Sequence, residues 1–353
     1  MNIGIITFHW AANHGAILQA YALCRFLKQK YQANVQIIDY YPKHMEHTLF
    51  NALRRLRPSA ILQGIREVKK DKCLKEFREK LPLTTRFYSN KQLIDEGLKM
   101  DVLITGSDQI WNPSFLRYGE EGGAPVYYLN FGDGKAKKLA VSASFGCKTF
   151  PDDCKSIVKQ LLDQFAGIGV RENTGIEILR SFDIQGGVVT ADPTALLSGD
   201  EYINISSKCP SIPANSVTKM ILRRQSKKNK ELISKVSSKF SNGRIFDLEF
   251  LSMQEWLAAI KNSKIVITNS FHCVMMCLKL HTPFVVILED GLSSGMNDRF
   301  MTLLDRFGLT DRVIKSEDDL INISKDIDFK QVDLNMELYA ETLTSFLERN
   351  ISK

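Results

Sequence analysis

The sequence has no long hydrophobic run. Nowhere in its 353 residues does an apolar stretch reach about 18 residues, the length that a transmembrane helix needs. Residues 1–7 lack the cationic start and the cleavage site of a secretory signal peptide and are expected to form a strand instead. We therefore expect a soluble protein of the cytoplasm.

Paired cysteines and several familiar catalytic motifs are also missing. The seven cysteines are scattered and form no CxxC pair, so reduced thiols fit better than disulfides or a zinc site. No GxGxxG, P-loop, GxSxG or HExxH motif is present. The absence of these motifs argues against a dinucleotide-binding enzyme, an NTPase, a hydrolase and a zinc enzyme. We expect neither a metal nor a cofactor.

Positive charge is concentrated in one segment. The whole chain carries a net charge of +7, and residues 54–80 alone hold ten basic and four acidic residues. One interpretation is a solvated helical face. The other is a surface for anionic lipid, which would bring residues 54–80 into peripheral contact with the inner surface of the membrane. We expect no nucleic acid partner.

Apolar strands alternate with helices along the chain, which predicts an α/β protein with parallel sheets. Strands are expected at 2–8, 35–40, 100–105, 126–129, 138–142, 167–171, 188–191, 217–223, 244–247, 264–268 and 284–288. The proline- and serine-rich stretch 206–216 marks a boundary in this pattern. We predict two Rossmann-like lobes whose sheets face a cleft, 1–198 and 199–332, with the C-terminal helix 333–353 packing back on the first lobe.

Ligands of such sheets bind beyond the carboxyl ends of the strands, so polar residues just after strands are the candidates. Residues 13–16 open the first helix, where free N–H groups can bind a polar ligand, although an Asn or Gly turn is an equal alternative. Residues 106–112 place four polar side chains and a tryptophan after a strand, which favours a ligand wall over a simple cap. Arg171 presents a fork that suits phosphate or carboxylate, or else pairs with Glu172 or Asp192.

The second half offers a strand-to-helix corner at residues 266–273. Asn269 or Ser270 is a natural helix cap, and His272 falls in the first helical turn. The positive end of the helix dipole disfavours an imidazolium there unless an anion is bound. Further along, Arg299 could add a cation, or be an exposed arginine at a helix start.

Several of these motifs together resemble the polysaccharide pyruvyl transferases. They are NHGAILQAYAL at 13–23, IDYYP at 38–42, GSDQIWN at 106–112, SFG at 144–146, VREN at 170–173, ADP at 191–193, TNSFHC at 268–273 and NDR at 297–299. The resemblance implies a glycosyltransferase-B-like fold with an acceptor-side first lobe and a donor-side second lobe. It also implies transfer of pyruvate from phosphoenolpyruvate, as a ketal, to a sugar of a surface polysaccharide or its precursor, free or lipid-linked, with release of phosphate.

The resemblance suggests a role for each candidate. His272 would be the donor-site acid or a phosphate ligand, Arg171 an anion clamp and Asp108 the acceptor-side base. Substrate-binding candidates are Asn13, His14, Gly15, Ser107, Gln109, Glu172, Ser270, Asn297 and Arg299. Family members often have arginine where Ser270 stands, so Arg171, Arg299 or the pair Arg223–Arg224 would supply the missing cation.

Two other functions stay open at this point. A nucleotide-sugar-dependent glycosyltransferase would share the two-lobed fold and transfer a sugar instead of pyruvate. A sugar- or phosphate-binding scaffold would show no turnover. A comparison of the binding of phosphoenolpyruvate with the binding of UDP- or CMP-sugars tests the first alternative. Release of phosphate would exclude the second.

Overall fold

A computed structural model describes residues 1–41, 47–53, 58–113, 124–222, 225–241, 243–288, 297–324 and 326–351. By its internal contacts the chain separates into two units, one comprising Met1–Leu196 with Tyr339–Lys353 and the other Leu197–Leu338. We call these unit 1 and unit 2 and describe each by itself. The division falls before the stretch 206–216, which lies within unit 2. Both units are α/β with parallel sheets, which confirms the predicted fold class.

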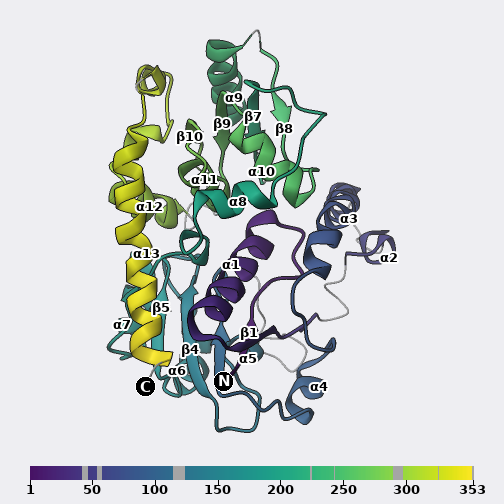
Figure 1. Ribbon diagram of the computed structural model, residues 1–353, viewed down its shortest axis with the longest axis vertical. Helices are drawn as coiled ribbons and strands as arrows, with labels where there is room; N and C mark the ends of the chain where they lie inside the picture. The colour runs from purple at the N-terminus through teal and green to yellow at the C-terminus, as the bar shows by residue number, and fades with distance from the viewer. Residues whose placement is uncertain are drawn as a thin grey trace. The chain divides into compact units, whose positions relative to one another are not determined.

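Unit 1 is built on a six-stranded parallel sheet in the order β2-β1-β3-β4-β5-β6. Figure 1 labels β1, β4 and β5 of this sheet. The strands are β1 (Asn2–Ile6), β2 (Asn34–Ile37), β3 (Val102–Thr105), β4 (Lys137–Ala143), β5 (Gly167–Val170) and β6 (Val188–Val189). β1 and β3 are short, continuous apolar runs buried over almost their whole length, as expected of central parallel strands covered on both faces. Because all strands of this sheet run parallel, their carboxyl ends lie along one edge of it.

The helices of unit 1 connect these strands. They are α1 (His14–Tyr31), α2 (Leu49–Leu53), α3 (Pro58–Glu79), α4 (Asn90–Asp95), α5 (Ala124–Tyr127), α6 (Asp152–Leu162), α7 (Asn173–Ser181) and the 3-10 turn η2 (Pro193–Ala195). The strand predicted at 126–129 is wrong, because part of this segment belongs to α5. A four-residue apolar run fits a buried strand and a buried helical turn equally well.

The last helix, α13 (Phe329–Ile351), begins in unit 2 and ends in unit 1. Within unit 1, the Ala191 N–H donates to Thr342 Oγ1 at 2.9 Å, which ties the end of α13 to the segment after β6. No helix in the described ranges is both long enough and apolar enough to cross a bilayer.

Unit 2 has a four-stranded parallel sheet in the order β10-β9-β7-β8. Its strands are β7 (Val217–Met220), β8 (Phe246–Asp247), β9 (Ile265–Thr268) and β10 (Phe284–Val286). Its helices are α8 (Gly199–Ile205), α9 (Lys227–Phe240), α10 (Met253–Lys261), α11 (Phe271–Lys279) and α12 (Asp298–Arg306), with the turns η4 (Thr310–Arg312) and η5 (Asp318–Ser324). Residues of β7, α9, β9 and β10 form its core.

Candidate active site

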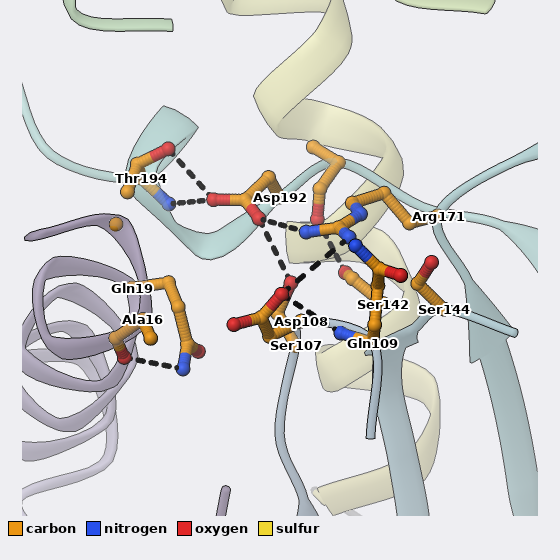
Figure 2. A network of polar contacts seen from close by, with 12 residues as sticks. Ala16, Gln19, Ser107, Asp108, Gln109, Ser142, Ser144, Arg171, Asp192 and Thr194 are labelled. Carbon is orange, nitrogen blue, oxygen red and sulfur yellow. Dashed lines mark hydrogen bonds and ion pairs between the residues drawn. The ribbon is translucent and has the colours of Figure 1, made fainter. Parts of the chain in front are cut away.

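Polar side chains gather at the carboxyl edge of the unit 1 sheet. The strands β3, β4, β5 and β6 lie side by side and parallel, so the segments that follow them are brought together. Figure 2 shows the resulting network, which includes Ser107, Asp108, Gln109, Ser142, Ser144, Arg171, Asp192 and Thr194. Several of the residues that the sequence singled out are therefore neighbours.

Arg171 is the centre of this network. Its side chain is 0% exposed, and its Nη1 lies 3.3 Å from Asp192 Oδ2. Nη2 lies 3.9 Å from Asp108 Oδ1, and Nε lies 3.9 Å from Glu172 Oε2. Burial alone would lower the pKa of Arg171, but the three carboxylates outweigh burial and raise it. The guanidinium is thus charged and surrounded by acids.

Asp192 is fully satisfied by its neighbours. Its Oδ1 accepts hydrogen bonds from the N–H of Thr194 at 3.0 Å and from the Thr194 hydroxyl at 2.7 Å. Its Oδ2 accepts from Ser107 Oγ at 2.8 Å and from Arg171. Its own N–H donates to the hydroxyl of Tyr339 at 3.1 Å, on α13. Asp192 therefore joins the ends of β3, β5 and β6 to the C-terminal helix.

Glu172 is buried and bound in the same way. Its Oε1 accepts from Ser144 Oγ at 2.8 Å, from the N–H of Phe145 at 3.0 Å and from the N–H of Gly146 at 3.3 Å. These donors all follow β4, while Glu172 follows β5. Its carboxylate thus connects the segments that follow two neighbouring strands. That Glu172 contacts substrate stays a prediction.

Asp108 is the carboxylate of the three with the largest exposure, 13% for the side chain against 3% for Glu172 and 0% for Asp192. Its Oδ1 accepts from the N–H of Gln109 at 2.8 Å. Its backbone has φ 84°, in the left-handed region that non-glycine residues rarely occupy. Such a conformation costs about 1–3 kcal/mol and is typical of functional sites. The sheet edge therefore presents one carboxylate that is fixed yet reaches the surface.

The end of β4 carries a second unusual backbone. The register of β4 against β5 shifts between Ala140 and Ala143, and Ser142 within this irregularity has φ 53°. The Ser142 hydroxyl bonds to the carbonyl of Ala191 and lies 3.0 Å from Thr190 Oγ1. This bulge leads directly into the segment that binds Glu172. No local pattern of residues predicts this bulge, because register shifts depend on the neighbouring strand.

Gln109 and its surroundings are tightly packed. Its Oε1 accepts from Asn112 Nδ2 at 2.7 Å, and Asn112 also approaches the carbonyl of Gly146 at 3.4 Å. A Cβ atom on Gly146, whose φ is 59°, would lie 2.3 Å from Gln109 Oε1. Trp111 stacks on Tyr128 in the core at a centroid distance of 5.2 Å. Gln109 therefore has a structural bond, and binding of substrate by it stays a prediction.

The segment that opens α1 adjoins the same edge. Asn13 is the N-cap of α1, and its Oδ1 accepts from the N–H of Gly15 at 3.0 Å. His14 and Gly15 are buried in the first turn. Gln19 donates to Thr7 Oγ1 at 2.8 Å, and the Thr7 hydroxyl donates to the carbonyl of Ser107 at 2.9 Å. This chain links α1 to the end of β3.

Sequence reasoning missed a triad beside this segment, in which His9 and Asp39 are buried and Arg86 is exposed. His9 Nε2 lies 3.0 Å from Asp39 Oδ1, and Arg86 Nε donates to Asp39 Oδ2 at 2.8 Å. Burial alone would raise the pKa of Asp39, but its hydrogen bonds and ion pairs with His9 and Arg86 outweigh burial and lower it. The available signal was the position of His9 and Asp39 just after two adjacent strands.

In unit 2, the predicted corner has the expected local structure. Ser270 is the N-cap of α11 and accepts from the N–H of Cys273 at 3.4 Å. Asn269 Oδ1 accepts from the N–H of Leu222, after β7, at 2.8 Å. His272 lies in the first turn of α11 and is buried, with its ring edge-on to Phe271 at 5.5 Å. The polar groups here follow β7 and β9, two adjacent strands.

Arg299 is connected to the same corner by contacts with two aromatic rings. Its guanidinium is 5.4 Å from the ring centroid of Phe300 on α12, and Phe300 is 6.2 Å from Phe271. Asn297 directly precedes α12. Arg223 and Arg224 lie outside the described residues. Arg299 therefore lies one ring away from the side chain of Phe271, next to His272 in the chain.

Comparison with solved structures identifies the fold class. UDP-N-acetylglucosamine 2-epimerase from Rickettsia bellii matches with a TM-score of 0.52 at 10% identity, over 99% of this chain and 98% of that chain. The enzyme from Neisseria meningitidis, bound to UDP-GlcNAc, has a TM-score of 0.48 at 12% identity, over 97% and 94% of the chains. The likeness to the Rickettsia bellii enzyme gives this chain a glycosyltransferase-B-like fold, as the resemblance implied.

The family follows from the sequence itself. The profile of the polysaccharide pyruvyl transferase family matches residues 13–291, and the chain belongs to this family. The matched range includes the Arg171 network of unit 1 and the His272 corner of unit 2. A search of curated proteins found no match.

Proposed function

We propose that the chain transfers pyruvate from phosphoenolpyruvate to two hydroxyls of one sugar, forming a ketal and releasing phosphate. The observation that carries this proposal is the match to the family over residues 13–291. This range includes both the Arg171 network of unit 1 and the His272 corner of unit 2. The acceptor is a sugar of a surface polysaccharide or its precursor, free or lipid-linked. We further propose that the reaction runs in the cytoplasm, which fits seven cysteines of which none forms a disulfide.

The chemistry needs an acid and a base. Protonation of the methylene carbon of phosphoenolpyruvate makes its central carbon electrophilic. One sugar hydroxyl attacks this carbon, the bond to phosphate breaks, and the second hydroxyl closes the ketal. The two hydroxyl protons are balanced by the new methyl hydrogen and by the proton that leaves with phosphate. General acid and base groups each contribute about 10²–10⁴-fold to such steps.

Asp108 is the proposed base on the acceptor side. Its side chain is the most exposed of the three carboxylates around Arg171, and its backbone is fixed by the strand-end geometry described above. A base must be held in place and must also be reachable, and Asp108 combines both properties. Asn13, His14 and Gly15 are proposed to lie on the acceptor side because they open the neighbouring helix.

His272 is the proposed donor-site acid or phosphate ligand. It lies in the first turn of α11, where the helix dipole favours a bound anion. Arg299, Asn297 and Ser270 are proposed to help bind the phosphate and carboxylate of the donor.

Arg171 was predicted to clamp the donor anion. Its guanidinium faces three carboxylates and its side chain is 0% exposed. This geometry supports a positioning role, in which Arg171 holds Asp108 in place. Direct contact with the donor stays a prediction, which kinetic constants for each substrate can test.

The decisive experiment is an assay of phosphate release from phosphoenolpyruvate, run with a panel of galactosides and N-acetylmannosamine conjugates. The proposal expects acceptor-dependent phosphate release and a pyruvylated sugar detected by mass spectrometry. Calorimetric titration compares phosphoenolpyruvate with UDP- and CMP-sugars. Binding of a nucleotide sugar without binding of phosphoenolpyruvate would instead make the chain a glycosyltransferase.

A further inference from the structure

Helices α2 and α3 expose an unusual number of large apolar side chains. On α2, Leu49, Phe50 and Leu53 are 54%, 67% and 62% exposed, while Ala52 is buried. On α3, Leu62 and Ile65 are exposed as well. The two helices contact each other, so these side chains belong to one region of unit 1. Elsewhere in the described chain, exposed large apolar side chains stand on separate elements or as the pair Leu334 and Leu338.

Basic side chains continue the same face of α3. Residues 62, 65, 66, 69 and 72 follow the spacing of three and four that places side chains on one side of a helix. Of these, Arg66, Lys69 and Lys72 are exposed. The face therefore changes along the helix from apolar to basic.

The nearby acids do not cancel this charge. Asp71 pairs with Arg78 at 2.7 Å. Glu76 pairs with Lys80 at 2.6 Å, and Glu79 pairs with Lys75 at 3.6 Å. Glu67, the remaining acid of α3, lies 4.0 Å from His47 Nδ1 and accepts from Gln63 Nε2 at 3.0 Å. With six basic and four acidic residues, α3 keeps a net charge of +2.

The opposite face of α3 is fixed to unit 1. Val68, Leu74 and Phe77 are buried, and Phe77 packs on Tyr21 of α1 at a centroid distance of 5.4 Å. Arg78 Nη1 donates to the carbonyl of Trp10, in the loop after β1, at 3.2 Å. The exposed face therefore belongs to a firmly attached helix, and that helix is bonded to the loop leading into α1.

We propose that the exposed face of α2 and α3 docks unit 1 on an anionic lipid bilayer. Phe50, Leu53 and Leu62 would enter the boundary between headgroups and acyl chains, and Lys69 and Lys72 would contact anionic headgroups. Exposed apolar side chains beside basic ones are the composition that interfacial helices use. Each basic residue near such a surface strengthens binding by about fivefold. This inference does not depend on the proposed reaction.

Charge complementarity favours a bilayer over a second copy of the chain. A twofold contact through this face would bring the basic side chains of both copies into one interface, against each other or against apolar side chains. Like charges placed opposite one another weaken an interface. An anionic lipid surface instead neutralises them while it covers the apolar side chains.

Flotation of the full chain with vesicles tests the proposal. Vesicles of phosphatidylglycerol and phosphatidylcholine are compared with vesicles of phosphatidylcholine alone, at low and high salt. We expect binding to the anionic vesicles that weakens as salt rises. The variant K69E/K72E should bind at least about 25-fold more weakly, since two attractive charges are lost. The variant F50S/L53S should lose about tenfold or more, because two apolar anchors are removed.

Matched controls use similar residues elsewhere in unit 1. The variant I94S/I157S changes two isoleucines that are each 46% exposed, and K135E/K148E reverses two exposed lysines. Both controls should bind vesicles as the unaltered chain does. Unchanged thermal unfolding shows that the docking variants are folded. The proposal fails if the unaltered chain does not float with anionic vesicles, or if F50S/L53S abolishes self-association and leaves vesicle binding intact.

Discussion

Arg171 Nη1 lies 3.3 Å from Asp192 Oδ2, and both side chains are 0% exposed. Asp192 is also bonded to Ser107 and Thr194, so the pair joins three strand ends. A buried ion pair of this kind stabilises little in itself, because both charges lose their hydration. Its value is geometric, since the guanidinium that Asp192 holds also lies 3.9 Å from Asp108.

Removal of the guanidinium should be costly. Arg171→Met leaves three carboxylates facing one another, and we expect the free energy of unfolding to fall by about 3–5 kcal/mol. Urea unfolding measures this loss. Arg180→Met, an exposed arginine on α7, is the matched control and should change little. Adding Asp192→Asn to Arg171→Met should recover part of the loss, and a purely additive double variant would contradict the pairing.

Substitution of Asp108 separates catalysis from stability. Asparagine tolerates the left-handed backbone and can still accept from the Gln109 N–H, so Asp108→Asn should fold normally. It lacks a basic carboxylate, and we expect kcat to fall by about 10²–10⁴-fold. Asp133→Asn, at an exposed position, serves as the control. A kcat close to that of the unaltered chain would exclude Asp108 as the base.

The two candidate cations should differ in their kinetic effects. Arg299→Met is expected to raise KM for phosphoenolpyruvate, because Arg299 is proposed to bind the donor. Arg171→Lys is expected mainly to lower kcat, because Arg171 is proposed to position Asp108 without contacting the donor. Steady-state kinetics with each substrate varied in turn measures both. If Arg171→Lys alone caused a large rise in the KM for phosphoenolpyruvate, Arg171 would instead contact the donor directly.

The neighbourhood of the strand-end residues could be predicted from sequence. Asp108, Arg171 and Asp192 each follow a predicted strand, so they were expected beyond the carboxyl ends of a parallel sheet. Their burial could not be predicted, because it depends on the register of β4 against β5 and on the shift at Ser142. A pattern of residue types indicates which side chains can pair, but it does not show whether water still reaches them.

Helix caps could also be predicted from the sequence, whereas contacts between residues far apart in the chain could not. Ser270 caps α11, as its residue type and position indicated. The contact of His9 with Asp39 joins residues 30 positions apart through two adjacent strands, and no local pattern reports it. The apolar face of α2 was missed for a similar reason, since only the folded chain shows which of its leucines are left uncovered.

The triad of His9, Asp39 and Arg86 predicts a dependence of stability on pH. The pKa of Asp39 in the folded chain lies below 3.8, the value taken for the unfolded chain. Its contribution is therefore complete above the unfolded pKa and is lost as pH falls through the folded pKa. Urea unfolding should show Asp39→Asn to be less stable at neutral pH, with the difference shrinking in acid. Asp133→Asn should show no such trend.

His272 provides the sharpest test of the donor site. His272→Gln keeps a polar side chain of similar reach but cannot act as an acid, so kcat for pyruvyl transfer should fall by about 10²–10⁴-fold. The matched control is His281→Asn, also in unit 2, where asparagine tolerates the φ of 54°. Equal thermal unfolding of the two variants would show that both are folded. If His272→Gln retained nearly full activity, protonation of the donor would have to come from another group.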